Sequence, residues 1–239
     1  MIPASAEFAA ALDSTNLRLD ATEADIEILC REAHTHHFAC VMIYPTSVPL
    51  AARLLAGSTV HLGTVIGFPS GRFSTRAKAA EIDAMAGAGA HEVDIVMNYA
   101  ALRAGRERDV ATELSELTQR AHGHGQRVKV ITENCYLVET EILNALKLCE
   151  EAGVDFIKTS TGFGSAGAKR EHVRLWAQHR RGSIKIKAAG GIKTLADALA
   201  LIDAGAERIG TSNASALLAE LGGTTGATGP TRGTPASEY

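Results

Sequence analysis

Short apolar segments rich in valine and isoleucine recur along the chain, separated by longer segments whose apolar residues have helical spacing. The apolar segments predict eight β-strands, at residues 11–15, 38–43, 60–67, 91–97, 128–132, 154–158, 184–187 and 208–210. The intervening patterns predict helices at residues 23–36, 48–55, 75–88, 107–123, 139–152, 169–180 and 195–204. Strict alternation of strands and helices is typical of a parallel sheet, because each helix returns the chain for the next strand.

Eight strand–helix repeats favour an α/β protein with a closed (β/α)8 barrel, the TIM-barrel fold, as a single domain over residues 1–221. A doubly wound open sheet is the structural alternative. The length of 239 residues suits one barrel, and 46% hydrophobic residues suffice for its core. Residues 222–239 are rich in glycine, threonine, proline and alanine without periodicity, which predicts a flexible C-terminal tail.

Charge and composition narrow the possible partners and the compartment. A net charge of -3 gives no indication of nucleic-acid binding, and the apolar runs are too short to span a membrane. The N-terminus lacks the pattern of a secretory signal. The four cysteines, at positions 30, 40, 135 and 149, show no close pairing pattern, as is usual for free thiols. We therefore expect a cytoplasmic protein that binds neither nucleic acid nor membrane.

Polar residues at the ends of the predicted strands indicate where chemistry takes place. In barrel enzymes the active site lies at the carboxyl ends of the strands. The polar residues at or beside those ends are Asp13, Asp94, Asn98, Glu133, Lys158 and Lys187. Two lysines among several acids form a plausible acid–base site and a poor match for a metal site. We therefore expect no metal at this site.

The most informative segment begins at Lys158, the last residue of an apolar strand. Desolvation at such a position lowers the pKa of a lysine and leaves a neutral, nucleophilic amine. The loop from Thr159 to Gly164 supplies small residues, hydroxyls and backbone N–H groups, which suit a phosphate. An amine beside a phosphate cradle suggests imine chemistry on a phosphorylated carbonyl compound.

Further glycine-containing loops follow the seventh and eighth strands, where barrel enzymes commonly bind phosphate. Any single glycine there is more simply explained by the end of a strand. Two such loops on adjacent strands, each close to a site lysine, favour phosphate binding. The candidate phosphate-binding residues are Gly162, Gly190, Gly191, Gly210, Ser212 and Asn213.

Seven sequence blocks carry a resemblance to a known family. They are LDSTNL (12–17), VIGFPSG (65–71), EVDIVMN (92–98), VKVITE (128–133), DFIKTSTGF (155–163), IKAAGGI (186–192) and RIGTS (208–212). Each block is weak evidence alone, but all seven occur in the family's order over about residues 10–215. The chain resembles the deoxyribose-phosphate aldolases, which are class I, Schiff-base aldolases on a (β/α)8 barrel.

The resemblance implies reversible cleavage of 2-deoxy-D-ribose 5-phosphate to acetaldehyde and D-glyceraldehyde 3-phosphate, without a cofactor. It implies Lys158 as the Schiff-base lysine, Lys187 as the lysine whose charge keeps Lys158 deprotonated, and Asp94 as the acidic partner in proton transfer. It also implies small-molecule partners, namely the phosphorylated sugar and aldehydes, and a homodimer. The family position one residue before the Ile-Tyr-Pro segment, cysteine in some members, is Met42 here, with Cys40 two residues away.

Four residues have supporting roles in this interpretation. Asp13, Lys129 and Thr161 are candidates for acid–base or substrate contacts, with a structural ion pair as the alternative for Lys129. Tyr239 ends the tail, as a tyrosine does in some members of the family, where it reaches the active site. Two interpretations of Tyr239 stay open: its phenol assists proton transfer, or it is simply the end of the tail and has no role.

Several other signals have simpler explanations. Residues 162–167 match G-x-G-x-x-G, but the acidic residue that a dinucleotide site needs about 20 positions later is absent. His34, His36 and His37 suit the C-terminus of a helix better than a metal. Lys185 shares strand parity with Lys187, which we prefer because it directly precedes the glycine loop. Residues 78 and 81, a lysine and a glutamate, are most simply a surface ion pair.

Two other functions remain possible on the sequence. One is a phosphate-binding barrel enzyme that acts on a different sugar phosphate. The other is a barrel that binds a phosphorylated metabolite without catalysis. Turnover of deoxyribose 5-phosphate would separate all three.

Overall fold

The computed structural model describes residues 3–223 and contains a closed barrel of eight parallel strands in chain order. The strands are β1 Leu12–Asn16, β2 Cys40–Ile43, β3 His61–Ile66, β4 Glu92–Val96, β5 Arg127–Ile131, β6 Phe156–Lys158, β7 Lys185–Ala189 and β8 Arg208–Thr211. The predicted (β/α)8 barrel is therefore confirmed, and the open sheet is excluded. The predictions for β2, β3, β4 and β6 are two residues too long, those for β1 and β5 are shifted by one residue, and those for β7 and β8 end too early.

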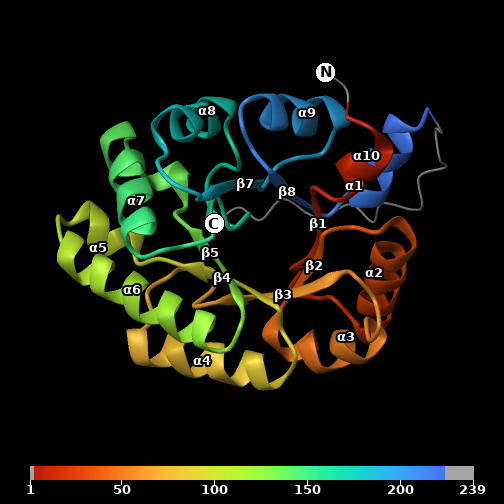
Figure 1. The fold of residues 1–239 in the computed structure, drawn as a ribbon, viewed down its shortest axis with the longest axis horizontal. Helices are drawn as coiled ribbons and strands as arrows, with labels where there is room; N and C mark the ends of the chain where they lie inside the picture. The colour runs from red at the N-terminus through yellow and green to blue at the C-terminus, as the bar shows by residue number, and fades with distance from the viewer. Residues whose placement is uncertain (1–2, 224–239) are drawn as a thin grey trace.

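Helices surround the barrel on its outside (Figure 1). They are α1 Ser5–Ala9, α2 Glu23–His36, α3 Val48–Leu54, α4 Thr75–Gly87, α5 Tyr99–Arg103, α6 Glu107–Gly123, α7 Glu139–Glu151, α8 Arg170–His179, α9 Leu195–Asp203 and α10 Ala214–Leu221, with 3-10 turns η1 Pro45–Ser47 and η2 Asn134–Tyr136. All seven predicted helices are present. Helices α1, α5 and α10 were not predicted from the sequence, because they are too short to show a helical period clearly. No helix in residues 3–223 is long and apolar enough to cross a membrane.

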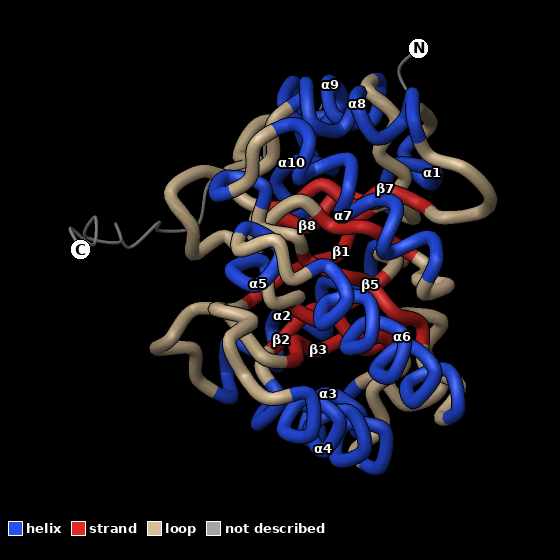
Figure 2. The backbone as a smooth tube through the Cα atoms, turned by 90° about the vertical axis from the view of Figure 1, so that its left-hand side faces the viewer, coloured by secondary structure: helices blue, strands red, loops and turns tan. Residues whose placement is uncertain are grey.

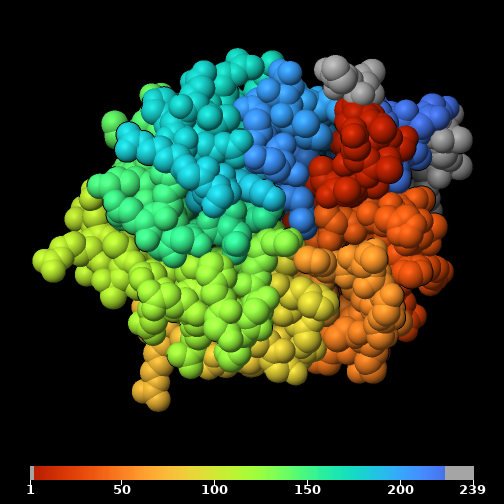
Figure 3. All heavy atoms as spheres, viewed as in Figure 1, coloured from red at the N-terminus to blue at the C-terminus, as the bar shows by residue number. Residues whose placement is uncertain are grey.

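The side view shows the strands enclosed by the helical layer (Figure 2). In the space-filling view the first and last described helices, α1 and α10, lie against one another and close the ring (Figure 3). Residues 224–239, including most of the predicted tail and Tyr239, lie outside the described part of the chain.

Helix α2 illustrates how local sequence sets the boundaries of an element. The Thr22 hydroxyl accepts a hydrogen bond from the Asp25 backbone N–H at 3.3 Å, and the Asp25 carboxylate accepts from Thr22 N–H at 2.7 Å. His34 and His36 occupy the last turn, and His37 ends the helix with a φ of 54°. The histidines therefore lie at a helix C-terminus, as predicted, where the helix dipole favours positive charge.

The core has two parts of different character. Between the barrel and the helices, one large cluster of valine, leucine, isoleucine and alanine side chains forms the usual apolar layer. Inside the barrel, where branched apolar residues usually dominate, most of the central side chains are charged. These buried charged residues are Asp13, Glu92, Asp94, Lys129, Lys158, Lys187 and Arg208. The interior of the barrel therefore holds an ionic network, beside a small second apolar cluster of Leu17, Cys40, Met42 and Val65.

The predicted surface pair of residues 78 and 81 is wrong. Lys78 is fully buried, and its amino group binds the Val96 carbonyl at 2.8 Å and the Glu113 carboxylate at 2.9 Å. Its stem passes Gly67, where a Cβ would lie 2.8 Å from Lys78 Cε, so the missing side chain makes room for it. Glu81 instead accepts a hydrogen bond from the Gly67 N–H at 2.7 Å.

Candidate active site

Asp94 lies at the centre of the ionic network and contacts three lysines. Its Oδ2 atom lies 2.7 Å from the amino nitrogen of Lys158 and 2.8 Å from that of Lys187. Its Oδ1 atom lies 2.8 Å from the amino nitrogen of Lys129. Asp94, Lys187 and Lys129 are fully buried, and Lys158 is 2% exposed. The structure thus brings together the three residues predicted as catalytic, with Lys129, predicted as a supporting residue, beside Asp94.

Strand register explains why these side chains meet. Lys158 pairs with Lys187 across β6 and β7, and Asp94 pairs with Lys129 across β4 and β5. Side chains alternate along a strand, so paired residues point to the same side of the sheet. Lys158 is the last residue of β6, which places its amino group toward the carboxyl end of the barrel, where barrel enzymes react.

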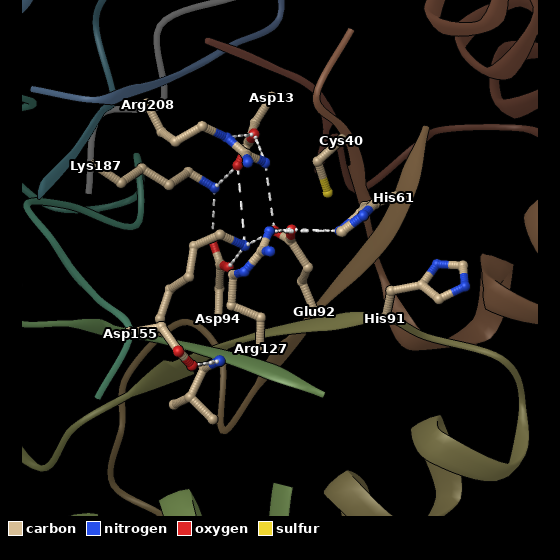
Figure 4. A network of polar contacts seen from close by, with 12 residues as sticks. Asp13, Cys40, His61, His91, Glu92, Asp94, Arg127, Asp155, Lys187 and Arg208 are labelled. Carbon is tan, nitrogen blue, oxygen red and sulfur yellow. Dashed lines mark hydrogen bonds and ion pairs between the residues drawn. The ribbon is translucent and has the colours of Figure 1, made fainter. Parts of the chain in front are cut away.

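A second group of charges lies deeper in the barrel (Figure 4). The Asp13 carboxylate lies 2.5 Å from the Lys187 amino group and binds the Arg208 guanidinium, whose Nε is 2.6 Å away. Glu92 lies 2.5 Å from the Lys129 amino group and 3.3 Å from Arg208 Nη2. At the barrel's amino end, the half-exposed His61 and Arg127 also bind Glu92. These contacts hold Lys187 and Lys129, two of the three lysines that contact Asp94, from deeper in the barrel.

The charges of the barrel interior do not balance if every group is ionised. Three buried carboxylates, Asp13, Glu92 and Asp94, face four buried cationic side chains, Lys129, Lys158, Lys187 and Arg208. Burial lowers the pKa of Lys158 from 10.5 to about 8; the Asp94 carboxylate opposes this shift, and the charge on Lys187 adds to it. Lys158 is thus the group that can release its proton near neutral pH.

The other central groups keep their charges. Burial alone would raise the pKa of Asp94, but Lys129, Lys158 and Lys187 outweigh it and hold that pKa well below the usual range. Burial would likewise lower the pKa of Lys129, but Asp94, Glu92 and Asp13 raise it above its ordinary value. The site therefore combines a neutral amine with a permanent carboxylate and a permanent ammonium group, the set required for imine formation and proton transfer.

Lys185 lies away from this centre. It begins β7 at the opposite end of the barrel, is exposed, and stands 5.8 Å above the centre of the Phe156 ring. Lys185 and Lys187 are two residues apart on β7, so their side chains point to the same side of the sheet. Lys185, however, lies at the exposed start of the strand, outside the buried interior. This placement agrees with the preference for Lys187.

One group of potential metal ligands lies within the network. Ligand atoms of Asp13, Cys40 and Glu92 are all within 4.8 Å of one another. Both carboxylates already bind lysine and arginine side chains, and burial raises the pKa of the Cys40 thiol well above its ordinary value. The three residues are therefore better suited to an ionic network than to a metal ion.

The glycine loops after β6 and β7 touch one another. The Ala168 N–H donates to the Gly190 carbonyl at 3.0 Å, and a Cβ on Gly190 would lie 3.5 Å from the Gly162 Cα. The Thr211 hydroxyl ties the end of β8 to the same region, donating to the Ile192 carbonyl at 2.8 Å. Three of the predicted phosphate residues, Gly162, Gly190 and Gly191, thus lie in two connected loops.

Two predicted phosphate residues have other contacts. Gly210 lies within β8, where a Cβ would come within 3.1 Å of Lys187 Cε, so this glycine makes room for the lysine. The Asn213 backbone N–H, expected to face a phosphate, donates to the Thr211 hydroxyl at 3.0 Å. Ser212, which lies between them in the sequence, is exposed. The first backbone N–H groups of α10 follow it, and such groups have no acceptor within their own helix.

Comparison with known proteins places the chain in a family. Residues 8–225 match the model of the DeoC/LacD family aldolases. The chain belongs to this family. The deoxyribose-phosphate aldolase of Carboxydothermus hydrogenoformans is 45% identical over 219 residues, which cover 91% of this chain and 96% of that protein. The deoxyribose-phosphate aldolase of Methanothermobacter thermautotrophicus is 46% identical over 207 residues, covering 86% and 91%.

Solved structures of this aldolase family agree with the fold. A tetrameric deoxyribose phosphate aldolase from Aeropyrum pernix superposes with a TM-score of 0.86 at 33% identity, covering 92% of each chain. A protein described as "QR15, an Aldolase" gives a TM-score of 0.85 at 37% identity, covering 90% of this chain and 95% of that one. The family resemblance inferred from the seven sequence blocks is thereby confirmed.

Two members of the aldolase's ionic network, Glu92 and Arg208, were not predicted as site residues. Period-two alternation does place Glu92 on the same strand face as Asp94, two residues before it. Arg208 begins β8, and its guanidinium reaches Asp13 and Glu92 across the interior. No local pattern distinguishes this arginine from a surface residue, because its partners lie far away in the sequence.

Proposed function

We propose that this DeoC/LacD family aldolase is a class I deoxyribose-phosphate aldolase. It reversibly cleaves 2-deoxy-D-ribose 5-phosphate to acetaldehyde and D-glyceraldehyde 3-phosphate, in the breakdown of deoxyribonucleosides. The proposal rests mainly on one observation: the amino groups of Lys158 and Lys187 both contact the same carboxylate oxygen of Asp94. The names of the similar proteins support the choice of substrate.

The neutral amine of Lys158 attacks the C1 aldehyde carbon of the open-chain sugar. Loss of water gives an iminium ion, which draws electrons from the C2–C3 bond. As the C3 hydroxyl loses its proton, that bond breaks, and D-glyceraldehyde 3-phosphate leaves an enamine on Lys158. Proton transfer to C2 and hydrolysis then release acetaldehyde and restore the free amine.

Asp94 and Lys187 suit the proton transfers in this sequence. A carboxylate with a bound water can take the proton of the C3 hydroxyl and return a proton to C2. Two carboxylates, those of Asp94 and Asp13, contact the Lys187 amino group, which lies beside the reacting amine. Asp13 and Lys129 support these two groups from within the barrel rather than at the substrate.

For the phosphate of the substrate we propose the loops that contain Gly162, Gly190, Gly191 and Ser212, with Gly210 and Asn213 shaping them. Exposed backbone N–H groups of glycines and a serine hydroxyl bind phosphate well. In a barrel enzyme, the loops after the seventh and eighth strands are the common place for such a site.

Cleavage of 2-deoxy-D-ribose 5-phosphate by the purified protein, coupled to a D-glyceraldehyde 3-phosphate dehydrogenase assay, tests the proposal. Wild-type protein should turn over this substrate, and Lys158→Met should abolish the activity. Turnover of a different sugar phosphate alone would support the rival enzyme. Tight binding without turnover of any sugar phosphate would support the non-catalytic barrel.

Three further expectations belong to this proposal. The phenol of Tyr239 is proposed to assist proton transfer at the acetaldehyde carbon, and unchanged turnover after its deletion would remove the idea.

A homodimer is proposed, whereas the Aeropyrum pernix relative is described as tetrameric. Light scattering on the purified protein would decide between a dimer and a tetramer. A cytoplasmic location is proposed, and the four cysteines are all free.

A further inference from the structure

Glu133 has a strained backbone two residues after the end of β5. Its φ of 52° and ψ of 60° lie in the left-handed region, which residues with a Cβ atom avoid. Among the described residues, His37 is the other non-glycine residue with positive φ, and it lies on the outside of the barrel as an exposed helix cap. Strain of this kind persists where the surroundings enforce it, and it gathers at functional sites.

The Glu133 carboxylate binds the loop that follows Lys158. The Thr161 backbone N–H lies 3.2 Å and 3.3 Å from its two oxygens, and the Thr161 hydroxyl donates a short hydrogen bond to Oε2. The same hydroxyl accepts a hydrogen bond from the Phe163 N–H at 3.0 Å. The Glu133 carboxylate thus holds residues 161–163 in place. The hydrogen of the Thr161 hydroxyl is used in the hydrogen bond to this carboxylate.

The carboxylate is enclosed by the loop that it orders. Glu133 is 2% exposed, and a Cβ on Gly164 would lie 3.1 Å from its Cδ atom. Burial raises the pKa of Glu133, although the hydrogen bonds from Thr161 and the charge of Lys158 oppose the shift. Burying a carboxylate costs free energy unless its hydrogen bonds are made, so the loop and Glu133 depend on one another.

The reactive lysine is held by separate contacts. The Thr132 backbone N–H donates to the Lys158 carbonyl at 3.1 Å, and the Asn134 N–H donates to the Thr159 carbonyl at 2.9 Å. These bonds use the backbone and do not need the Glu133 side chain. Loss of the Glu133 carboxylate should therefore release residues 161–164 and leave Lys158 in place.

We infer that Glu133 is a positioning residue, which holds the 161–164 loop in the shape that receives the phosphorylated end of the substrate. The inference rests on the proposed function, because that proposal assigns this loop to the substrate. Thr161 then acts as a link between Glu133 and the loop, and its hydroxyl does not donate a proton to the sugar.

The test compares Glu133→Gly and Glu133→Gln with a control, Glu141→Ala. Glycine adopts a φ of 52° without strain, so Glu133→Gly removes the carboxylate while keeping the backbone. Glutamine retains one acceptor oxygen for Thr161. Glu141 lies on the same connection at the start of α7, and its carboxylate accepts only from the Val138 N–H among the described hydrogen bonds.

We expect Glu133→Gly to raise KM for 2-deoxy-D-ribose 5-phosphate about tenfold or more, with a smaller change in kcat. Glu133→Gln should show a smaller rise, and Glu141→Ala none. Trapping of acetaldehyde on Lys158 by borohydride should proceed at the wild-type rate, because acetaldehyde carries no phosphate. Hydrogen exchange in a peptide covering residues 159–164 should be faster in Glu133→Gly.

Thr161→Val gives an independent test, because it removes the link and keeps the carboxylate. It should raise KM as Glu133→Gly does, and the double variant should be no worse than the poorer single variant. Unchanged KM and exchange in Glu133→Gly would overturn the inference, and so would acetaldehyde trapping that falls as much as substrate binding. A wild-type protein without turnover would contradict the proposed function instead, while the exchange rates would still decide whether Glu133 holds the loop.

Discussion

Lys158 and Lys187 direct their amino groups at the same oxygen atom of Asp94, at 2.7 Å and 2.8 Å. Two ammonium groups so close together in a buried site repel one another, and one carboxylate charge cannot balance both. The arrangement therefore favours one neutral and one charged lysine. Lys187 has a second carboxylate, Asp13, at 2.5 Å, which makes Lys158 the better candidate for the neutral amine.

Replacing Lys187 with methionine should raise the pKa of Lys158, because a positive charge that opposes its protonation is lost. Below that pKa, each unit of increase cuts the neutral fraction of the amine about tenfold. The pH profile of kcat/KM should therefore have its rising limb near pH 8 in the wild type and at higher pH in Lys187→Met.

Lys185→Met is the matched control for that experiment, since Lys185 lies at the exposed end of the same strand. It should leave the pH profile where it is in the wild type. If the rising limb of the kcat/KM profile moved in Lys185→Met and stayed in place in Lys187→Met, the charge that lowers the pKa of Lys158 would belong to Lys185 instead of Lys187.

Lys158→Met should stabilise the fold at neutral pH. The pKa of Lys158 is lowered from 10.5 to about 8 on folding, so keeping it buried costs roughly 3 kcal/mol below about pH 8. Asp94 would still bind Lys129 and Lys187, so no carboxylate is left without a cation. Urea unfolding at pH 7 should show the variant to be more stable than the wild type.

The advantage of Lys158→Met should shrink as the pH rises. Between about pH 8 and pH 10.5 the unfolded wild-type chain binds a proton at Lys158 that the folded chain has released. Stability increases with pH wherever the unfolded state binds more protons, so the wild type gains stability over this window. A gain for the variant that stays constant from pH 7 to pH 10 would contradict the lowered pKa.

Asp94→Asn should separate imine formation from proton transfer. The Asp94 charge raises the pKa of Lys158, so its loss keeps the amine neutral, and acetaldehyde should still be trapped on Lys158. Turnover of the sugar phosphate should fall about 100-fold or more, because an amide cannot accept the proton. Asp83→Asn, on the outer surface beside Arg120, should have normal turnover. Full activity in Asp94→Asn would remove Asp94 from the mechanism.

Removing one member of the buried pair Lys78 and Glu113 should destabilise the barrel strongly. Lys78→Met leaves a buried carboxylate without its cation and should lower the free energy of unfolding by about 3–5 kcal/mol. The double variant Lys78→Met, Glu113→Leu should recover most of this loss. Arg106→Ala, which breaks an exposed pair with Asp109, should cost less than about 1 kcal/mol. Equal losses in Lys78→Met and Arg106→Ala would contradict the burial of Lys78.

The fold and the grouping of the candidate site residues could be predicted because both follow from repeating rules. Parallel strands of a closed barrel direct their carboxyl ends to one side, and alternation along each strand selects the inward residues. Those two rules were enough to group Asp94 with Lys158 and Lys187, which lie 64 and 93 positions after it in the sequence.

Other features depend on tertiary contacts that no local pattern contains. Lys78 has the spacing of a surface residue on α4, and only the space left by Gly67 lets its stem enter the interior. The partners of Arg208 lie on β1 and β4, 195 and 116 positions before it in the sequence. The Asn213 N–H donates a hydrogen bond to the Thr211 hydroxyl because of the geometry of the turn before α10, and a sequence pattern does not specify that geometry.

The central claim is that Lys158 is a neutral amine that forms an imine with the substrate aldehyde. The most direct measurement is reductive trapping, in which the protein is incubated with acetaldehyde and borohydride, digested, and analysed by mass spectrometry. The account predicts one stable ethyl adduct, on Lys158, in the wild type. An adduct on Lys187 instead would reverse the two roles, and a folded protein without any specific adduct would contradict the Schiff-base mechanism.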